Sequence, residues 1–166
     1  MKKTKFLTLS LIMLACTAGV FAQANATATA TAVILTPLSI TTQTNMDFGD
    51  IVAGAGGDVV LNPQTSARST TGPAVFGTFS LATFNVTGNN DGVLTISLPA
   101  DHTITRLTGT ETMIIDAFSS FPSGTITLSA VGAGTLNVGA TLNVGAAQVP
   151  GTYENAAGFT VTVNYQ

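Results

Sequence analysis

The last eight residues of the chain, Phe159 to Gln166, read FTVTVNYQ. Large apolar side chains occupy every second position, Phe159, Val161, Val163 and Tyr165, with threonine or asparagine between them. Because side chains of a β-strand point alternately to its two faces, this spacing places the four apolar residues on one buried face. The stretch therefore predicts a half-buried β-strand at the very end of the chain, where most small proteins fray.

Short runs of the same kind recur along the chain between clusters of turn residues, and no helical period is found after residue 26. Strands are predicted at Thr27–Leu35, Ser39–Thr41, Asp58–Leu61, Leu81–Val86, Val93–Leu98, Met113–Phe118, Thr125–Ala130, Thr135–Val138, Thr141–Val144 and Phe159–Tyr165. Many short strands separated by turn signals are typical of an all-β sandwich or barrel.

Two segments carry information about how the strands connect. The sequence VTGNNDGVLTISLP, Val86–Pro99, predicts a hairpin whose turn spans Gly88–Gly92. The sequence TLNVG at Thr135–Gly139 recurs at Thr141–Gly145. Since a hexapeptide β-helix needs many such repeats, two copies predict either adjacent strands or one bulged strand, with glycines at the bends.

Residues 1–26 have the layout of a secretory signal peptide. Three lysines within the first five residues precede an apolar stretch that ends at Ala22, and overlapping small-x-small motifs follow. We expect secretion, with cleavage near Ala24 or Ala26. A retained membrane anchor and a lipid-modified Cys16 are the alternatives, although the apolar stretch is at the short limit for a membrane span.

Removal of this segment leaves a chain with few charges. Arg68 and Arg106 are then its only cations, against eight acidic residues, which gives a formal net charge of −6. The basic footprint that nucleic-acid binding requires is missing. The only cysteine leaves as well, so no disulfide can form. We expect one domain, residues 37–166, that binds no nucleic acid.

No constellation of residues predicts catalysis. His102 is the only histidine, and on a strand the neighbouring Asp101 would point to the opposite face, where it could not orient a catalytic base. His102 is therefore predicted as a surface residue in a loop. The DFG triplet, Asp47–Gly49, lacks the lysine and catalytic loop of a kinase, so we interpret Phe48 as a core residue and Gly49 as a turn. We expect no enzymatic activity, no cofactor and no small-molecule substrate.

Two acidic, turn-rich segments are candidates for a cation. GNNDG, Gly88–Gly92, and DFGD, Asp47–Asp50, offer oxygen ligands, but neither has the regularly spaced acids and terminal glutamate of an EF-hand loop. Turn chemistry explains their asparagine and aspartate residues without a metal. We expect no metal site, with calcium binding at one of these segments as the alternative.

Several segments together resemble a known family. They read ATATAVILTPLSI, MDFGDI, VTGNNDGVLTISLP, LNVGATLNVGAAQVPGTY and FTVTVNY, and they extend over nearly the whole mature chain. Their pattern is similar to that of an uncharacterised family of secreted bacterial proteins, domain of unknown function 4402. This resemblance implies secretion but no particular activity.

The two ends of the mature chain resemble, more distantly, those of fimbrial subunits of the chaperone–usher type (pilins). Such subunits end in an alternating strand with a penultimate aromatic, which Phe159–Tyr165 matches; Gly151 lies slightly too early for their C-terminal glycine. The resemblance implies an immunoglobulin-like antiparallel β-sandwich, lacking one strand, that passes through the periplasm. A periplasmic chaperone would hold the terminal strand until an outer-membrane usher assembles the subunits.

The same resemblance gives residues 27–36 the role of a donor strand. Ala28, Ala30, Ala32 and Ile34 lie on one face of this run and would fill the groove of the next subunit by strand addition. The sequence thus predicts a structural or adhesive cell-surface subunit that polymerises with itself or with other fimbrial subunits. The alternative is a self-complete secreted sandwich, in which Thr27–Leu35 is its own first strand and loops bind a protein or glycan.

Overall fold

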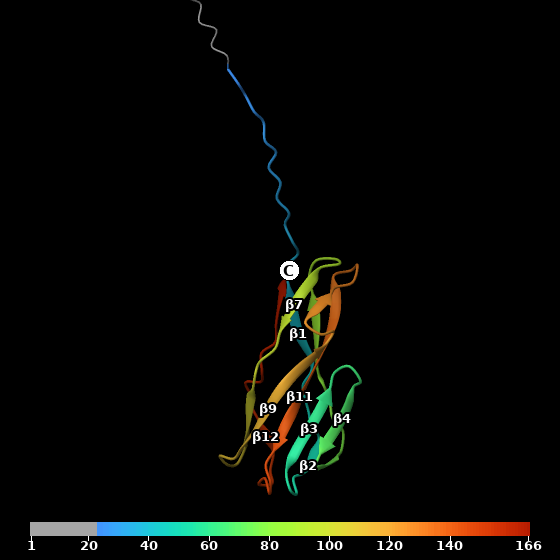
Figure 1. The fold of residues 1–166 in the computed structure, drawn as a ribbon, viewed down its shortest axis with the longest axis vertical. Helices are drawn as coiled ribbons and strands as arrows, with labels where there is room; N and C mark the ends of the chain where they lie inside the picture. Colours follow the sequence, from blue (N-terminus) through green and yellow to red (C-terminus); the bar gives the residue numbers. More distant parts are fainter. Residues whose placement is uncertain (1–22) are drawn as a thin grey trace, which may run out of the picture. The chain divides into compact units, whose positions relative to one another are not determined.

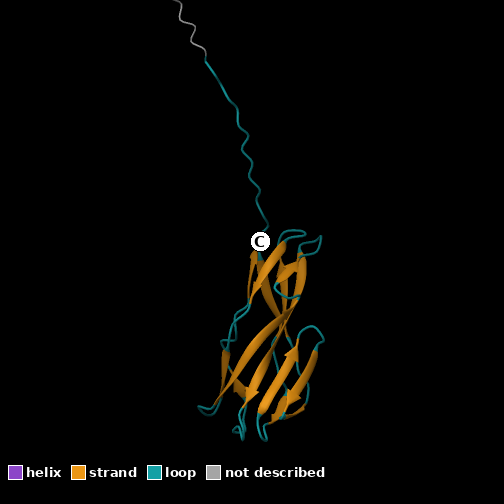
Figure 2. Cartoon of the chain, viewed as in Figure 1, coloured by secondary structure: helices purple, strands orange, loops and turns teal. Residues whose placement is uncertain are grey.

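The computed structural model describes residues 23–166, and the chain divides into two units after Val33. The signal-peptide prediction falls mainly on residues 1–22, outside the described residues, and stays a prediction. Residues 23–33 form no helix or strand, and all are exposed (Figure 2). Residues 34–38 also lack regular structure. The strand predicted at Thr27–Leu35 is therefore wrong for the single chain.

The second unit, Ile34–Gln166, is built from strands and loops (Figures 1 and 2). Its strands are β1 (Ser39–Thr44), β2 (Asp50–Val52), β3 (Gly57–Asn62), β4 (Ala67–Thr71), β5 (Ala74–Phe76), β6 (Ala82–Thr87), β7 (Val93–Ser97), β8 (His102–Arg106), β9 (Thr112–Phe121), β10 (Thr125–Thr127), β11 (Ala133–Val144), β12 (Tyr153–Glu154) and β13 (Thr162–Tyr165). The described residues include no helix, and hence none that could cross a membrane.

The strands form three antiparallel sheets. The largest has the order β1-β6-β11-β9-β8-β12, and β3 joins it by pairing with β11 and carries β4 on its other side. A second sheet has the order β10-β7-β13, and a third consists of β2 and β5. The predicted all-β class with an antiparallel sandwich is confirmed.

Strand β11 organises the largest sheet. Its first half pairs with β6, its second half pairs with β3, and β9 pairs with it along the other side. Leu136, Val138, Ala140, Leu142 and Val144 alternate inward and are buried. The repeated TLNVG motif is thus one continuous strand with a register shift against β9, one of the two arrangements predicted. The extra residue lies on β9, where Ala117 has a positive φ of 46°.

Two hydrophobic clusters fill the sandwich. The first joins β6 and β11 to β7, β10 and β13, and contains Val86, Leu94, Leu128, Leu136 and Val163. The second joins β3, β9 and the far half of β11, and packs against Ile51 of β2 and Val75 of β5. The largest sheet is therefore covered at its two ends by two different small sheets.

The hairpin predicted from VTGNNDGVLTISLP is wrong. Strands β6 and β7 flank the turn as expected, but β6 pairs with β1 and β11, whereas β7 pairs with β10 and β13. The turn at Gly88–Gly92 therefore crosses from one layer of the sandwich to the other. Alternating strands around a glycine-rich turn are compatible with both connections, because each arrangement buries one face of each strand.

Gly139 lies against the backbone of β3. A Cβ atom added there would collide with the carbonyl oxygen of Leu61, and it would lie 2.8 Å from Pro63 Cδ. We predict that Gly139→Ala lowers the free energy of unfolding by about 1–3 kcal/mol, because the backbone of β3 must move. The matched control is Gly134→Ala on the same strand, where the nearest atom is the flexible Ile126 Cδ1 at 3.0 Å. Urea unfolding measures both, and equal losses would contradict this explanation.

Candidate functional site

A groove crosses the inner face of the largest sheet. Its volume is ≈ 1420 Å³, and its walls are two chain stretches, residues 42–54 and residues 147–159. The floor consists of apolar side chains from three strands: Ala82 and Phe84 of β6, Met113 and Ile115 of β9, and Leu142 and Val144 of β11. A smaller hollow of ≈ 210 Å³ shares Phe84 and Phe159 with the groove and continues it to Val161.

Strand β1 borders this groove on one side, and residues 155–161 border it on the other. Within residues 23–166, β1 pairs only with β6, and β13 pairs only with β7. Residues 155–161, which lead into β13, belong to no strand. Unpaired strand edges present rows of N–H and C=O groups that can accept another strand. The groove therefore offers an apolar floor together with backbone hydrogen-bonding partners.

The four residues predicted on the C-terminal strand all face the interior. Val161 and Val163 are buried, and Phe159 and Tyr165 are half-buried against the first cluster. The Phe159 ring packs against Phe118, with ring centroids 5.0 Å apart. The paired strand, however, begins at Thr162, so Phe159 and Val161 line the groove from an unpaired segment.

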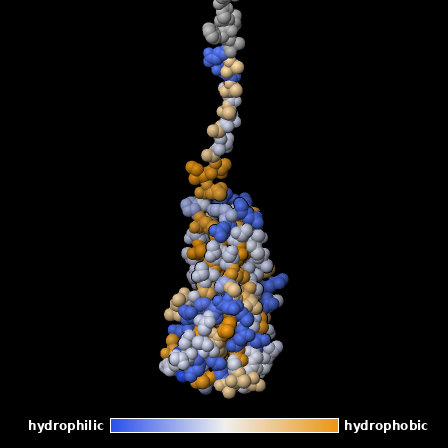
Figure 3. Space-filling view, turned by 60° about the vertical axis from the view of Figure 1, so that its left-hand side comes forward, coloured by the Kyte–Doolittle hydropathy of each residue, from blue (hydrophilic) through white to orange (hydrophobic). Residues whose placement is uncertain are grey.

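The candidate donor residues are all exposed. Ala28, Ala30 and Ala32 lie outside any strand, and Ile34 is 96% exposed. Val33 and Leu35 are exposed as well, so three large apolar residues follow one another. In the space-filling view, hydrophobic residues along the extended segment gather at its C-terminal part (Figure 3).

Arg68 fixes the first wall of the groove. Its Nη1 donates hydrogen bonds to the carbonyl oxygens of Phe48 (2.8 Å) and Phe76 (3.0 Å), and its guanidinium lies 5.0 Å from the centroid of the Phe79 ring. The DFG triplet belongs to this wall: Asp47 Oδ1 accepts the Gly49 N–H at 2.8 Å, and Gly49 has a φ of 78°. The interpretation of DFG as a buried phenylalanine followed by a turn is confirmed.

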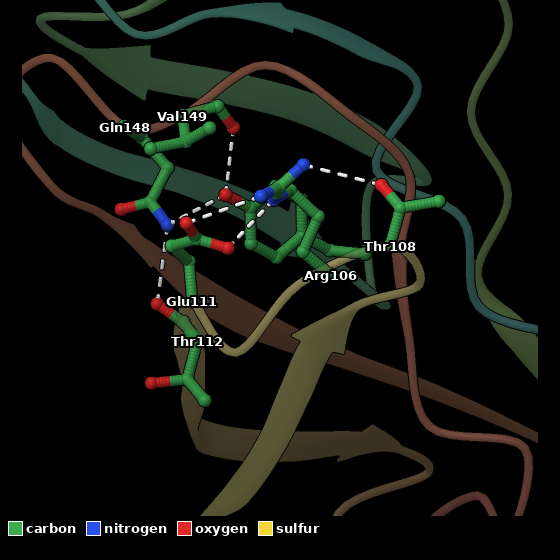
Figure 4. A network of polar contacts seen from close by, with 7 residues as sticks. Arg106, Thr108, Glu111, Thr112, Gln148 and Val149 are labelled. Atoms are coloured by element: carbon green, nitrogen blue, oxygen red, sulfur yellow. Dashed lines mark hydrogen bonds and ion pairs between the residues drawn. The ribbon is translucent and has the colours of Figure 1, made fainter.

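Arg106 and Glu111 stabilise the second wall (Figure 4). Arg106 Nε and Nη2 donate to the two carboxylate oxygens of Glu111, at 2.6 and 3.1 Å. Gln148 Nε2 donates to the carbonyl oxygen of Thr112 and to the Tyr153 hydroxyl, which itself donates to the Val149 carbonyl oxygen. These contacts attach residues 148–153 to the tip of the β8–β9 hairpin.

Gly151 has a packing role in the same wall. Its φ of 152° favours glycine, and an added Cβ would lie 2.8 Å from Cδ of Arg106. The Arg106 side chain therefore occupies the space that any other residue at this position would need. Sequence patterns did not reveal the roles of the two arginines, since their partners lie on other strands or loops.

His102 differs from its prediction as a surface loop residue. It begins β8, is half-buried, and contacts the Phe159 ring edge-on, with ring centroids 6.1 Å apart. It thus forms part of the groove lining. In the part of the chain that the structure describes, no three His, Cys, Asp or Glu side chains form a group that could hold a metal ion.

The fold places this chain among all-β sandwich proteins, and a groove lies over the inner face of its largest sheet. Residues 38–165 match the family described as "Domain of unknown function (DUF4402)", and the chain belongs to this family. No curated protein and no solved structure matches the chain.

The ion pair of the second wall should make the stability of the fold depend on pH. The hydrogen bond from Arg106 lowers the pKa of Glu111 below its usual value. A carboxyl whose pKa is lower in the folded chain stabilises the fold at neutral pH, and this stabilisation is lost as the pH falls through the folded pKa. We predict that Glu111→Gln lowers the melting temperature at pH 7 and that its difference from wild type shrinks in acid.

Thermal unfolding between pH 7 and pH 3 tests this prediction. Glu154→Gln is the matched control, because Glu154 is exposed on the same wall and its carboxylate does not bond Arg106. A Glu111→Gln difference that stays constant over this range would contradict the assigned role of the pair.

Proposed function

We propose that this protein is a structural subunit of a cell-surface assembly, in which residues 27–35 of one copy bind as a strand in the groove of the next. The observation that supports the proposal most directly is the groove itself. It combines an apolar floor with backbone edges at β1 and residues 155–161. The proposed role is structural and not enzymatic.

The shape of the groove suits a strand. It runs between residues 42–54 and residues 147–159 and continues through the smaller hollow to Val161. A groove that is bordered along its length by backbone suits an extended segment such as Thr27–Leu35.

The side chains of the candidate donor suit the floor. Floor residues such as Phe84 and Ile115 are already buried, at 8% and 5% exposure, so little depth remains above them. Small side chains such as those of Ala28, Ala30 and Ala32 fit a shallow groove. Each buried methyl group contributes about 0.8 kcal/mol, against about 1.5–3 kcal/mol for Ile34. Main-chain pairing along the groove edges would supply the remaining affinity.

The export route is part of the proposal. After removal of the signal peptide, the chain would enter the periplasm, where a chaperone would pair with the terminal strand and keep the groove from uncontrolled pairing. An outer-membrane usher would then exchange the chaperone for the N-terminal segment of the next subunit and deliver the assembly to the cell surface. The exposed Val33–Leu35 segment supports the need for a partner, because three adjacent large apolar residues are costly to leave in water.

Ile34→Asp tests the assembly. The mature variant should polymerise at least tenfold less than wild type, because the substitution removes the largest inward apolar side chain and buries a charge. Val33→Asp is the matched control: it makes the same change one residue away, on the face that would point out of the groove. Unheated detergent gels and size-exclusion chromatography measure the polymer fraction.

Two results would contradict the proposal. If both variants lose polymer equally, the segment does not bind as a strand with one buried face. If the wild-type chain itself stays monomeric at high concentration, the protein is a self-complete module, and its loops become the candidate binding surface.

A further inference from the structure

The Tyr165 hydroxyl joins the end of β13 to the β6–β7 turn and to the chain just before β1. It donates a hydrogen bond to the Thr36 carbonyl oxygen at 2.8 Å and accepts one from the Asn89 backbone N–H at 2.7 Å. A phenol has one proton to donate, and here that proton is used on Thr36. The end of β13 is thus bonded to the chain just before β1.

The hydroxyl lies close to Gly88 and Leu38. A Cβ atom added to Gly88 would lie 2.6 Å from the Tyr165 hydroxyl and 3.1 Å from Leu38 Cδ1. Leu38 packs against the first hydrophobic cluster, and the Gly88 N–H donates to the Gly132 carbonyl oxygen at 2.9 Å. The hydroxyl therefore lies between the β6–β7 turn and the start of β1.

The chain at residues 36–38 is poorly suited to reversing its direction. Thr36 precedes a proline, which restricts it to an extended conformation, and Pro37 has a fixed φ and no N–H. The two-residue turns that most commonly join adjacent antiparallel strands require a positive φ at their first central residue, which proline cannot adopt. A donor strand that paired with β1 of its own molecule through a tight turn here would have Pro37 in or beside that turn.

We infer that the Tyr165 hydroxyl, by holding the Thr36 carbonyl, keeps residues 36–38 extended and so directs residues 27–35 to the groove of a second copy instead of their own. This inference rests on the proposed function. Tyr165 is a positioning residue in this account: it makes no contact with the incoming strand, but it decides which molecule receives that strand. The penultimate aromatic residue would thus prevent self-complementation.

Tyr165→Phe in the full mature chain tests the inference. Loss of one hydrogen bond should raise the ratio of monomer to polymer about fivefold. These monomers should have filled grooves, so an added synthetic peptide of residues 27–35 should not raise their melting temperature. Thr70→Val is the matched control, because the Thr70 hydroxyl also donates one hydrogen bond to a backbone carbonyl oxygen, that of Pro73, and Thr70 does not line the groove.

A second variant tests the same junction without altering Tyr165. Pro37→Gly restores a backbone N–H and lets residue 37 adopt a positive φ. It should therefore also raise the fraction of monomers whose melting temperature does not rise when the peptide is added. This variant keeps the inference testable if Tyr165→Phe fails to fold.

The outcomes separate this inference from the proposed function. If wild type polymerises and both junction variants polymerise equally well, the inference is overturned and the assembly stands. If the variant monomers bind the peptide and melt higher, their grooves are empty, Tyr165 only stabilises the fold, and the inference is again overturned. A wild-type chain that forms no polymer overturns both.

Discussion

The structure depends on the backbone pairing of β11. This strand holds β6 and β3 on one side and β9 on the other, so the largest sheet extends continuously across both hydrophobic clusters. The opposite layer is divided between the β10-β7-β13 sheet at one end and the β2-β5 sheet at the other. The groove lies between residues 42–54 and residues 147–159, over the inner face of the continuous sheet, whose apolar side chains there are buried.

The two arginines of the chain both stabilise the walls of this groove. Arg68 bonds to carbonyl groups of the first wall, and Arg106 pairs with Glu111 and packs against Gly151 in the second. Each wall is a loop-rich stretch, so a side chain that makes several hydrogen bonds at once can fix the position of its backbone. A guanidinium suits this role because its five donors have a fixed geometry and it stays charged.

Sequence patterns identified the elements whose signal is local. The alternation of Phe159–Tyr165 correctly indicated the buried face of the terminal segment, and the TLNVG repeat was correctly limited to one or two strands. Strands β4 and β8 escaped detection because their residues, ARSTT and HTITR, carry few apolar side chains.

The pairing partners of the strands were harder to predict than the strands themselves. The turn at Gly88–Gly92 suits a hairpin as well as a crossing between layers, and only tertiary packing decides between them. The groove could not be predicted as a site, since its walls lie roughly 100 residues apart in sequence and a local pattern does not report such contacts.

The central claim is that the groove accepts a strand from outside the molecule. The most direct test adds a synthetic peptide of residues 27–35 to the full mature chain carrying Ile34→Asp. In this variant the chain's own residues 27–35 compete poorly with the peptide for the groove. Binding to the folded state stabilises it by about 2.7 kcal/mol at a peptide concentration one hundred times the Kd. The account predicts that the melting temperature rises by several degrees with peptide concentration, whereas a peptide carrying the Ile34→Asp change has no effect. A melting temperature that stays constant at millimolar peptide would contradict the account.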